Sequence, residues 1–382
     1  MVSSKSEAAE PLAGFTIGVT AARRAEELIT LLERRGAKVM HAPAIRIVPL
    51  VDDEELRTVT AALIASPPDI VVVTTGIGFR GWIEAAHGWA VAGGLTDSLG
   101  SARILARGPK GRGAVRQAGL CGQWSPESES SAEVLARLLA EGVEGLRIAV
   151  QLHGAATEWE PDTDICDALT AAGAKVIKVP VYRWELPADL RRMDQLIGAI
   201  INGELDALSF TSAPAVASML DRAKALGALD ALLVAMRDDV RVMCVGPVTS
   251  APFDKLDVPT SYPQRYRLGA LARLITDELP SSAERFSAGG HEISIRSASV
   301  EVDGTVKSVP PAAMSLLKCL LVRPGRVVSR DELLSALPGG GDDTHAVETG
   351  MARLRSALDA PRVIQTVVKR GYRLAVDPEG VA

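Results

Sequence analysis

Aromatic residues, cysteines and histidines are all scarce in this chain of 382 residues. Only 4% of the residues are aromatic, whereas Ala, Val, Leu and Gly are abundant, a composition that suits helices packed on sheets better than a β-sandwich. The four cysteines lie far apart without any CxxC pair, which indicates reduced core thiols rather than a disulfide framework. The five histidines form no HxxxH or HExxH pattern, so we expect no metal site.

Long apolar runs and a strong net charge are also missing. No segment approaches the roughly 20 apolar residues that span a bilayer, so we expect no membrane partner. The start "MVSSKSEAAE" lacks the apolar core of a signal peptide, which favours a cytoplasmic protein. The net charge is −5, so no overall field attracts the chain to nucleic acid. A chain of this length is expected to form two or three domains.

The part of the chain before residue 280 contains an internal repeat. The segment "RRGAKVMHAPAIRIVPL" around Gly36 is similar to "AAGAKVIKVPVYRWELP" around Gly173. In the same order, "DIVVVTTGIGF" from Asp69 is similar to "DALSFTSAPAV" from Asp206, and "ILARGPKGRGAV" is similar to "VMCVGPVTSAPF". Three matches in one order predict two similar lobes.

Each lobe alternates short apolar runs with amphipathic stretches, which predicts βαβ units and a parallel sheet. Two Pro-flanked extended segments, "APAIRIVP" and "VPVYRWELP", hold equivalent places in the repeats, and we expect them to be crossover strands. The predicted fold class is α/β, with two similar parallel-sheet lobes joined by two crossover strands. The predicted bounds are 12–42 and 188–280 for lobe 1, 51–178 for lobe 2, and 43–50 and 179–187 for the linkers.

The body formed by residues 12–280 resembles the uroporphyrinogen-III synthase (HemD-like) family. The resemblance rests on "DIVVVTTGIGF" and "DALSFTSAPAV", where the family has a strand that ends in a Thr-Ser turn, and on "CVGPVTS" and "YPQRYRLGALARLI". Members of that family close hydroxymethylbilane into a ring with inversion of one pyrrole, in a cleft between the lobes and without cofactor or metal. The resemblance therefore implies no cofactor and a tetrapyrrole-like polyanion as the ligand.

Such a ligand is held by helix starts and cations at the carboxyl ends of parallel strands. Thr211, Ser212 and Thr249 are suited equally to helix capping. Tyr182, where the family often has a tyrosine, and Thr211 are the catalytic candidates. The candidate ligand-binding residues at the strand ends are Arg23, Thr75, Arg107, Lys110, Arg112, Thr211, Ser212 and Thr249.

The segment "GIGFRG" from Gly76 to Gly81 also matches the GxGxxG pattern of dinucleotide-binding folds. That pattern requires an acidic residue at the end of the next strand, but the next strand, "RILARG", ends in Arg107. The equivalent turn "TSAPAV" of the other lobe has no glycine. We therefore rank a nicotinamide cofactor below a tetrapyrrole-like anion.

The carboxyl-terminal part of the chain has a different pattern. After the expected linker 281–288, "DGT" predicts a hairpin turn, and "PAAMSLLKCLLVRPG" predicts a helix. Ser329 and Glu332 form the capping box of a second helix. The segment "DTHAVETGMARLRSAL" predicts a third helix. The inward positions of the first and third helices are Met314, Leu317, Leu320, Leu321, Val347, Met351, Leu354 and Leu358.

The order of a hairpin, three helices and the final hairpin "IQTVVKRGYRL" predicts a winged helix-turn-helix. It resembles the OmpR/PhoB-type DNA-binding domain over residues 289–376. Between Thr344 and Val376, six basic residues stand against two acidic ones, a net charge of +4 that suits contact with phosphates. In that family the third helix enters the major groove and the wing meets the minor groove or phosphates.

By position, the resemblance implies that His345, Thr349 and Arg353 face the groove, and that Lys369 and Arg370 lie in the wing. Two further arginines belong to this set: Arg355, which more often supports the fold in such domains, and Arg373, which is placed to buttress the wing. Two residues depart from the family pattern. Gly350 weakens the third helix, and Val368 stands where many relatives have the wing arginine.

Two functions fit these patterns. The first is a transcription regulator that binds promoter DNA through its tail and uses the synthase-like body as a sensor or scaffold. The second is a working uroporphyrinogen-III synthase, a cyclising hydro-lyase, with an added DNA-binding tail. We favour the regulator because an enzyme needs no DNA-binding tail. Fusions of this order resemble actinobacterial regulators of nitrate and nitrite assimilation, and another regulator or RNA polymerase is a further candidate partner.

Overall fold

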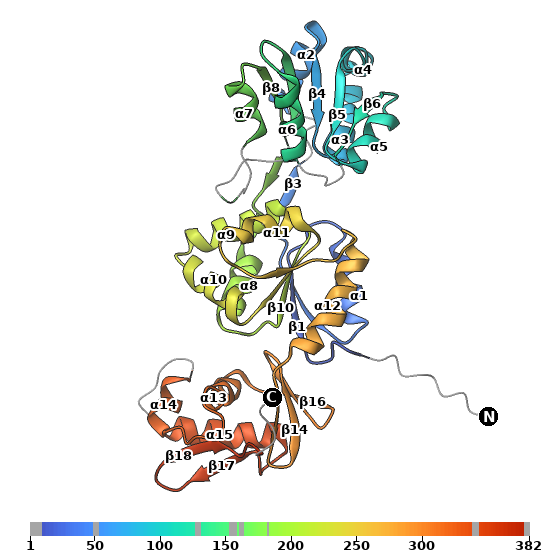
Figure 1. Ribbon diagram of the computed structural model, residues 1–382. Helices are drawn as coiled ribbons and strands as arrows, with labels where there is room; N and C mark the ends of the chain where they lie inside the picture. The colour runs from blue at the N-terminus through green and yellow to red at the C-terminus, as the bar shows by residue number, and fades with distance from the viewer. Residues whose placement is uncertain are drawn as a thin grey trace, which may run out of the picture. The chain divides into compact units, whose positions relative to one another are not determined.

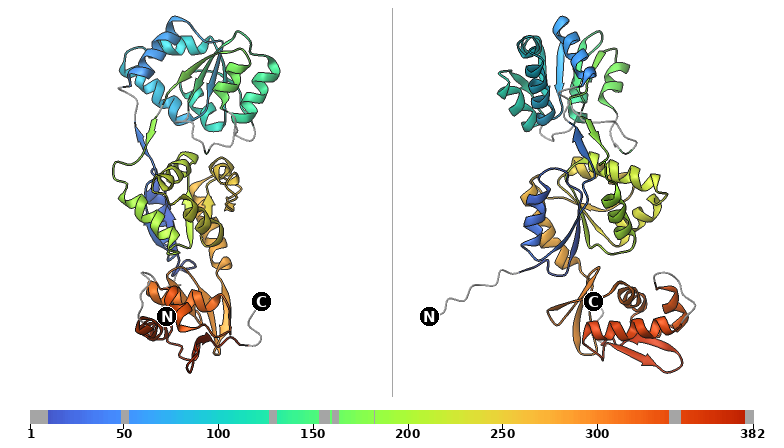
Figure 2. Two further views of the ribbon diagram at one scale, coloured as in Figure 1. Left: turned by 90° about the vertical axis from the view of Figure 1, so that its left-hand side faces the viewer. Right: turned by 180° about the vertical axis from the view of Figure 1, so that it is seen from behind.

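The computed structural model describes residues 10–48, 53–126, 131–152, 159, 164–181, 183–337 and 344–377 (Figures 1 and 2). The chain divides into two compact units. One unit contains residues 1–44 and 189–382, and the other contains residues 45–188. The first unit holds lobe 1 and the carboxyl-terminal domain, and the second unit holds lobe 2.

Lobe 1 is built on a parallel sheet of five strands in the order β12-β11-β10-β1-β2. Helices α1 and α12 cover one face of this sheet, whereas α8, α9 and α10 cover the other (Figure 1). The strands are β1 (Thr16–Val19), β2 (Lys38–His41), β10 (Ala207–Phe210), β11 (Arg241–Cys244) and β12 (Thr260–Ser261). The helices are α1 (Ala25–Glu33), α8 (Arg191–Ile201), α9 (Ala213–Ala225), α10 (Leu229–Asp238), α11 (Pro247–Asp254) and α12 (Leu268–Ser282).

Lobe 2 has a parallel sheet in the order β6-β5-β4-β7-β8. Val71 and Val73 of β4 pack with the core of α2 to α5, whereas Ile70 and Val72 pack with the core of α6 and α7. The strands are β4 (Ile70–Val73), β5 (Arg103–Ala106), β6 (Gly122–Trp124), β7 (Arg147–Gln151) and β8 (Lys175–Val179). The helices are α2 (Glu54–Ala65), α3 (Gly76–Gly88), α4 (Ala92–Gly100), α5 (Pro109–Gln117), α6 (Ser131–Glu141) and α7 (Ile165–Ala171).

The two sheets have the same topology. The central strand of each sheet follows the repeated Asp: β10 follows Asp206 and lies beside β1, and β4 follows Asp69 and lies beside β7. The extended segments form an antiparallel pair, β3 (Arg46–Val48) with β9 (Arg183–Glu185). The prediction of two similar parallel-sheet lobes with two crossover strands is therefore confirmed.

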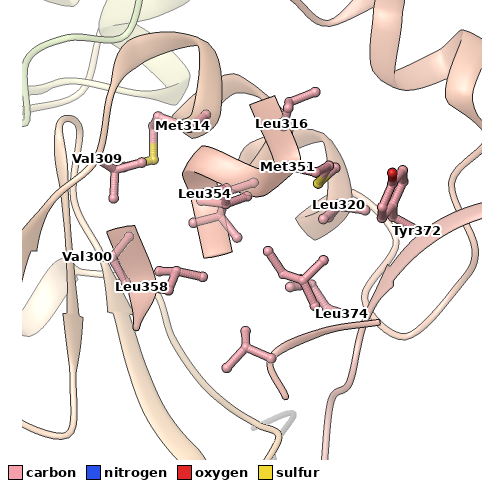
Figure 3. Packing of buried hydrophobic residues seen from close by; sticks show 14 of the residues in the cluster. Val300, Val309, Met314, Leu316, Leu320, Met351, Leu354, Leu358, Tyr372 and Leu374 are labelled. Atoms are coloured by element: carbon pink, nitrogen blue, oxygen red, sulfur yellow. The ribbon is translucent and has the colours of Figure 1, made fainter. Parts of the chain in front are cut away.

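The carboxyl-terminal domain begins with an antiparallel sheet in the order β13-β14-β15-β16, followed by three helices and a final hairpin. Its core joins all three helices to both sheets. Figure 3 shows part of this core, with labelled residues from the first and third of these helices and from both sheets. The strands are β13 (Arg285–Ala288), β14 (His291–Ile295), β15 (Ser299–Val302), β16 (Thr305–Ser308), β17 (Ile364–Val367) and β18 (Gly371–Leu374). The helices are α13 (Pro311–Leu321), α14 (Arg330–Ser335) and α15 (Thr344–Leu358). This arrangement is the predicted winged helix-turn-helix.

Several local predictions in this domain are confirmed. Ser329 accepts a hydrogen bond from the Glu332 amide at 3.2 Å, and the Glu332 carboxylate accepts one from the Ser329 amide at 2.9 Å, so the capping box is complete. All the inward positions expected on α15 are buried. On α13, the expected Leu321 is only partly buried, whereas Leu316, which was not expected, is fully buried.

Two expectations differ from the structure. Residues 281–288, expected to be a linker, are the end of α12 and strand β13, whose Phe286 and Ala288 alternate into the core. The polar neighbours of these residues hid the alternation. The four cysteines are unpaired as expected, but Cys121 is exposed and is therefore not a core thiol. Among the described residues, no helix is long and apolar enough to cross a membrane.

Candidate nucleic-acid interface and strand-end residues

Helix α15 presents a polar stripe on the side away from the core. His345, Thr349 and Arg353 are spaced at four residues and therefore share one face of the helix. His345 and Arg353 are exposed, and Thr349 is partly exposed. Within the described residues, Arg353 makes no hydrogen bond or ion pair, so its guanidinium is available to an external anion. The structure thus brings the three groove-facing candidates together.

The wing is the turn between β17 and β18. Val368 at its tip is 78% exposed, and Lys369 and Arg370 beside it are also exposed. Lys369 has φ 62°, so the turn is tight, and Gly371 has φ 134°. A Cβ at Gly371 would lie 2.0 Å from the Val328 carbonyl oxygen, so only glycine permits this contact between wing and domain.

Arg355 and Arg373 are used within the domain. Arg355 Nη2 donates to the Thr366 hydroxyl at 2.8 Å and to the Ile364 carbonyl at 3.0 Å, and its guanidinium lies 5.6 Å from the Tyr372 ring. Arg373 Nε donates to Gln365 Oε1 at 3.0 Å across the hairpin. Both side chains therefore hold the wing in shape through contacts within the domain.

Gly350 has a packing role that its low helix propensity concealed. A Cβ at this position would lie 2.6 Å from Leu316 Cδ1 on α13. Leu316 is fully buried in the domain core, so a side chain at residue 350 would have to displace it. Gly350 thus allows α15 to lie close to α13, and this contact offsets the cost of glycine within a helix.

Sequence reasoning did not select Arg330, which lies beside α15. Its Nε is 3.8 Å from Glu348 Oε1 on α15, and its guanidinium lies 5.8 Å from the Tyr372 ring. The only signal in the sequence was its place directly after the cap residue Ser329. Arg330 adds positive charge next to Glu348, the one acidic side chain on α15.

In lobe 2, the candidate residues lie at the carboxyl ends of neighbouring strands β4 and β5. Thr75 caps α3 and accepts a hydrogen bond from the Gly78 amide at 3.2 Å. Gln151, which sequence reasoning missed, is buried and donates to the Thr75 hydroxyl at 2.9 Å. Arg107 follows β5, and Lys110 and Arg112 are exposed on α5.

Two of the three GxGxxG glycines, Gly76 and Gly78, are explained by packing inside lobe 2, whereas a Cβ at Gly81 would meet nothing within 4 Å. A Cβ at Gly76 would lie 2.2 Å from the Lys110 carbonyl oxygen, so the starts of α3 and α5 are in close contact. A Cβ at Gly78 would lie 2.6 Å from both Gln151 and Val181. Gly76 and Gly78 therefore face protein atoms.

In lobe 1, the candidates lie after β1, β10 and β11, three strands that are neighbours in the sheet. Arg23 is exposed, and Ser212 occupies the N-cap position of α9 without a side-chain capping bond. Thr211 is partly exposed, whereas Thr249 is 4% exposed and therefore turned toward the interior. Tyr182 lies outside the described residues.

These features define a two-lobed α/β body followed by a winged helix-turn-helix domain. Residues 26–273 match the family model "Uroporphyrinogen-III synthase HemD", and residues 304–374 match "Transcriptional regulatory protein, C terminal". The chain therefore belongs to the uroporphyrinogen-III synthase family and carries an OmpR/PhoB-type DNA-binding domain at its carboxyl-terminal end. This fusion is that of a DNA-binding regulator.

Individual proteins are similar to the body. The uncharacterized protein YjjA of Bacillus subtilis is 25% identical over 68% of this chain and 94% of its own length. A putative uroporphyrinogen-III synthase of Methanothermobacter thermautotrophicus is 25% identical over 64% of this chain and 90% of its own length. A mutant uroporphyrinogen III synthase from Thermus thermophilus is similar in structure, with a TM-score of 0.59 and 26% identity over 70% of this chain and 100% of that chain.

Proposed function

We propose that this protein is a transcription regulator in which the synthase-like body, residues 12–280, responds to a ligand, and residues 289–376 bind promoter DNA. The observation that carries the proposal is Arg353, which has no partner among the described residues and lies beside His345 and Thr349 on the outer face of α15, next to a basic wing. An exposed arginine in such a place suits a base edge or a phosphate of double-stranded DNA.

Binding to DNA is tested with the full chain and a labelled promoter fragment by fluorescence anisotropy over a range of salt concentrations. The double variant Arg353→Ala with Lys369→Ala should bind at least about fivefold more weakly, and its salt slope should fall by about 2, one for each lost phosphate contact. The matched control is Arg192→Ala with Lys38→Ala, which removes the same charge from exposed positions of lobe 1. Equal loss in both variants would point to net charge alone and would refute the assigned interface.

The proposed ligand is a tetrapyrrole-like polyanion held at the carboxyl ends of the strands. Support comes from the family of the body and from the exposed cations Arg23, Lys110 and Arg112 at or near strand ends, where helix starts also favour anions. Arg112→Ala should weaken binding of uroporphyrin, measured by absorbance titration, without changing the affinity for DNA.

An active synthase is the second candidate, because the body belongs to a family of synthases. Purified protein supplied with enzymatically generated hydroxymethylbilane distinguishes the two. Type III isomer above the spontaneous background would make the chain a bifunctional enzyme and regulator. Type I isomer alone would leave the body as a sensor or scaffold.

We also propose that the protein acts in the cytoplasm and that the genes it regulates serve nitrate and nitrite assimilation. The support is the order of the fusion, a synthase-like body before an OmpR/PhoB-type domain. Haem-type reductases of that pathway depend on tetrapyrroles, so a tetrapyrrole sensor suits their control. Equal affinity for nitrite reductase promoters and for unrelated DNA of the same length would refute this assignment.

A further inference from the structure

The connection between lobe 1 and the DNA-binding domain is very short. Only Ala283 and Glu284 separate the end of α12 from the start of β13. The Ile295 amide donates to the Glu284 carbonyl at 2.9 Å, and Arg285 Nη2 donates to the Pro280 carbonyl at 3.2 Å. Both sides of the connection are therefore held by hydrogen bonds, and it does not act as a flexible tether.

Asp206 joins the two domains through its carboxylate. It precedes β10 and accepts hydrogen bonds from the Thr16 amide at 2.7 Å and from both the amide and the hydroxyl of Ser297 at 2.6 Å. Ser297 lies in the turn between β14 and β15 of the DNA-binding domain. Burial raises the pKa of the Asp206 carboxyl, whereas its three donors favour the ionised form.

The internal repeat provides a comparison within the same molecule. Asp69 precedes β4 in lobe 2 and accepts a hydrogen bond from the Arg147 amide at 2.8 Å, just as Asp206 accepts one from the Thr16 amide. This bond fixes the start of the neighbouring strand in both lobes. The two hydrogen bonds from Ser297 go to Asp206, the lobe 1 member of this pair, and they are not needed to form the sheet.

A pair of glycines at equivalent positions of the two lobes also differs in its contact with the DNA-binding domain. Gly14 and Gly145 each precede the strand by two residues, with φ 79° and 76°. A Cβ at Gly14 would lie 2.5 Å from Ser299 Oγ and 2.6 Å from Val306 Cγ1, both in the DNA-binding domain, whereas a Cβ at Gly145 would meet nothing within 4 Å. The Ser299 hydroxyl also donates to the Gly14 carbonyl at 2.8 Å.

Two cationic side chains complete the contact. Arg296, which is 8% exposed, pairs with Glu301 and lies 4.5 Å from the centre of the Phe15 ring in lobe 1. Lys318 Nζ on α13 donates to the Gly203 carbonyl at 3.1 Å. The contact therefore combines stacking on a buried aromatic ring with hydrogen bonds, a composition unlike that of a solvated surface.

We propose that the amino-terminal edge of the lobe 1 sheet is a docking surface for the DNA-binding domain, anchored by Asp206, so that lobe 1 and this domain move as one body. The occupant is the turn Arg296 to Ser299 of the same chain. Strand β10 follows Asp206 and leads to the segment of Ser212 at its other end. A conformational change at the proposed ligand-binding end of this strand therefore has a direct path along the strand to the docked domain.

The test measures hydrogen exchange of the Ser297 amide in the full chain by mass spectrometry, because the bond to Asp206 is the one that would protect this turn amide. Asp206→Asn should accelerate exchange at Ser297 about tenfold or more. The matched control Asp69→Asn removes the equivalent carboxylate of lobe 2. It should accelerate exchange at Arg147 and leave Ser297 unchanged.

Gly14→Ala and Gly145→Ala form a second matched pair, which decides the question if Asp206→Asn unfolds lobe 1. Both variants place alanine at a positive φ, so they share the backbone cost, but only Gly14→Ala should accelerate exchange at Ser297. An unprotected Ser297 amide in the unaltered chain, or equal effects of the two glycine variants, would overturn the proposal. The test needs no DNA, so its failure is separate from failure of the proposed function.

Discussion

Arg355 offers the sharpest test of how the wing is held. The substitution Arg355→Ala removes the hydrogen bonds to Ile364 and Thr366 and the contact with the Tyr372 ring. Hydrogen bonds from a charged group contribute about 1.5–3 kcal/mol each, and the partly exposed position calls for the low end. A cation over an aromatic ring adds about 0.5–1 kcal/mol. These contributions sum to about 3.5–4 kcal/mol, but the partly exposed Arg355 also competes for water, so we expect the β17–β18 hairpin to lose only about 2–3 kcal/mol of stability.

This loss is measured by hydrogen exchange of the β17 and β18 amides, which should become about 30- to 150-fold faster, since each 1.4 kcal/mol is a factor of ten. Tryptophan fluorescence cannot report it, because all five tryptophans lie between residues 82 and 184, in the other unit. The matched control is Arg353→Ala on the same helix. Its side chain is exposed and unpaired within the described residues. The free energy of hairpin opening obtained from exchange should therefore stay within about 0.5 kcal/mol of the value for the unaltered chain.

The two arginine variants should separate stability from recognition. Arg353→Ala should weaken DNA binding without loosening the hairpin. Arg355→Ala should loosen the hairpin, whether or not DNA is present. Unchanged exchange in Arg355→Ala would show that the strand pairing holds the wing without this side chain and would refute the reasoning.

Three further predictions follow from the described geometry. The hydrogen bond from the Ser329 amide is the main cause that lowers the pKa of Glu332 from 4.5 to about 2. The capping box should therefore stabilise α14 fully above pH 4.5, and this stabilisation should be lost as the pH falls toward 2. Exchange in α14 should show this pH dependence, and Glu332→Gln should remove it. Gly350→Ala should destabilise the domain by about 1–3 kcal/mol through overpacking against Leu316, despite better helix propensity, and a stabilised variant in thermal unfolding would contradict this. Cys121 should react fastest with a thiol reagent, and its replacement by serine should abolish the fast phase.

Most of the fold could be predicted because its signals are local or repeated. The similarity between the segments at Gly36 and Gly173 indicated two lobes, and the capping box at Ser329 located α14 to the residue. The inward face of α15 followed from helical periodicity alone. Strand β13 was missed because its two inward residues lie among polar neighbours, a pattern too short to distinguish from a linker.

The functional details depended on contacts between distant segments. Sequence placed Asp69 and Asp206 at equivalent positions, but it could not show that Ser297 contacts one of them and not the other. In the same way, Gly350 was recognised as a poor helix former, whereas its partner Leu316 lies on another helix. Residue type and spacing identify candidates, and the tertiary contact decides which candidate has a partner.

The docking contact at Asp206 uses the end of the sheet opposite to the one where parallel sheets bind ligands. A fusion at that end leaves every strand-end loop free to keep or change its specificity. Asp206 fixes the start of a strand, as Asp69 does, so Ser297 of the docked domain binds a carboxylate that the sheet itself also uses. The loops that would contact a ligand and the residues that contact the DNA-binding domain are therefore two different sets, and strand β10 connects the ends of the sheet at which they lie.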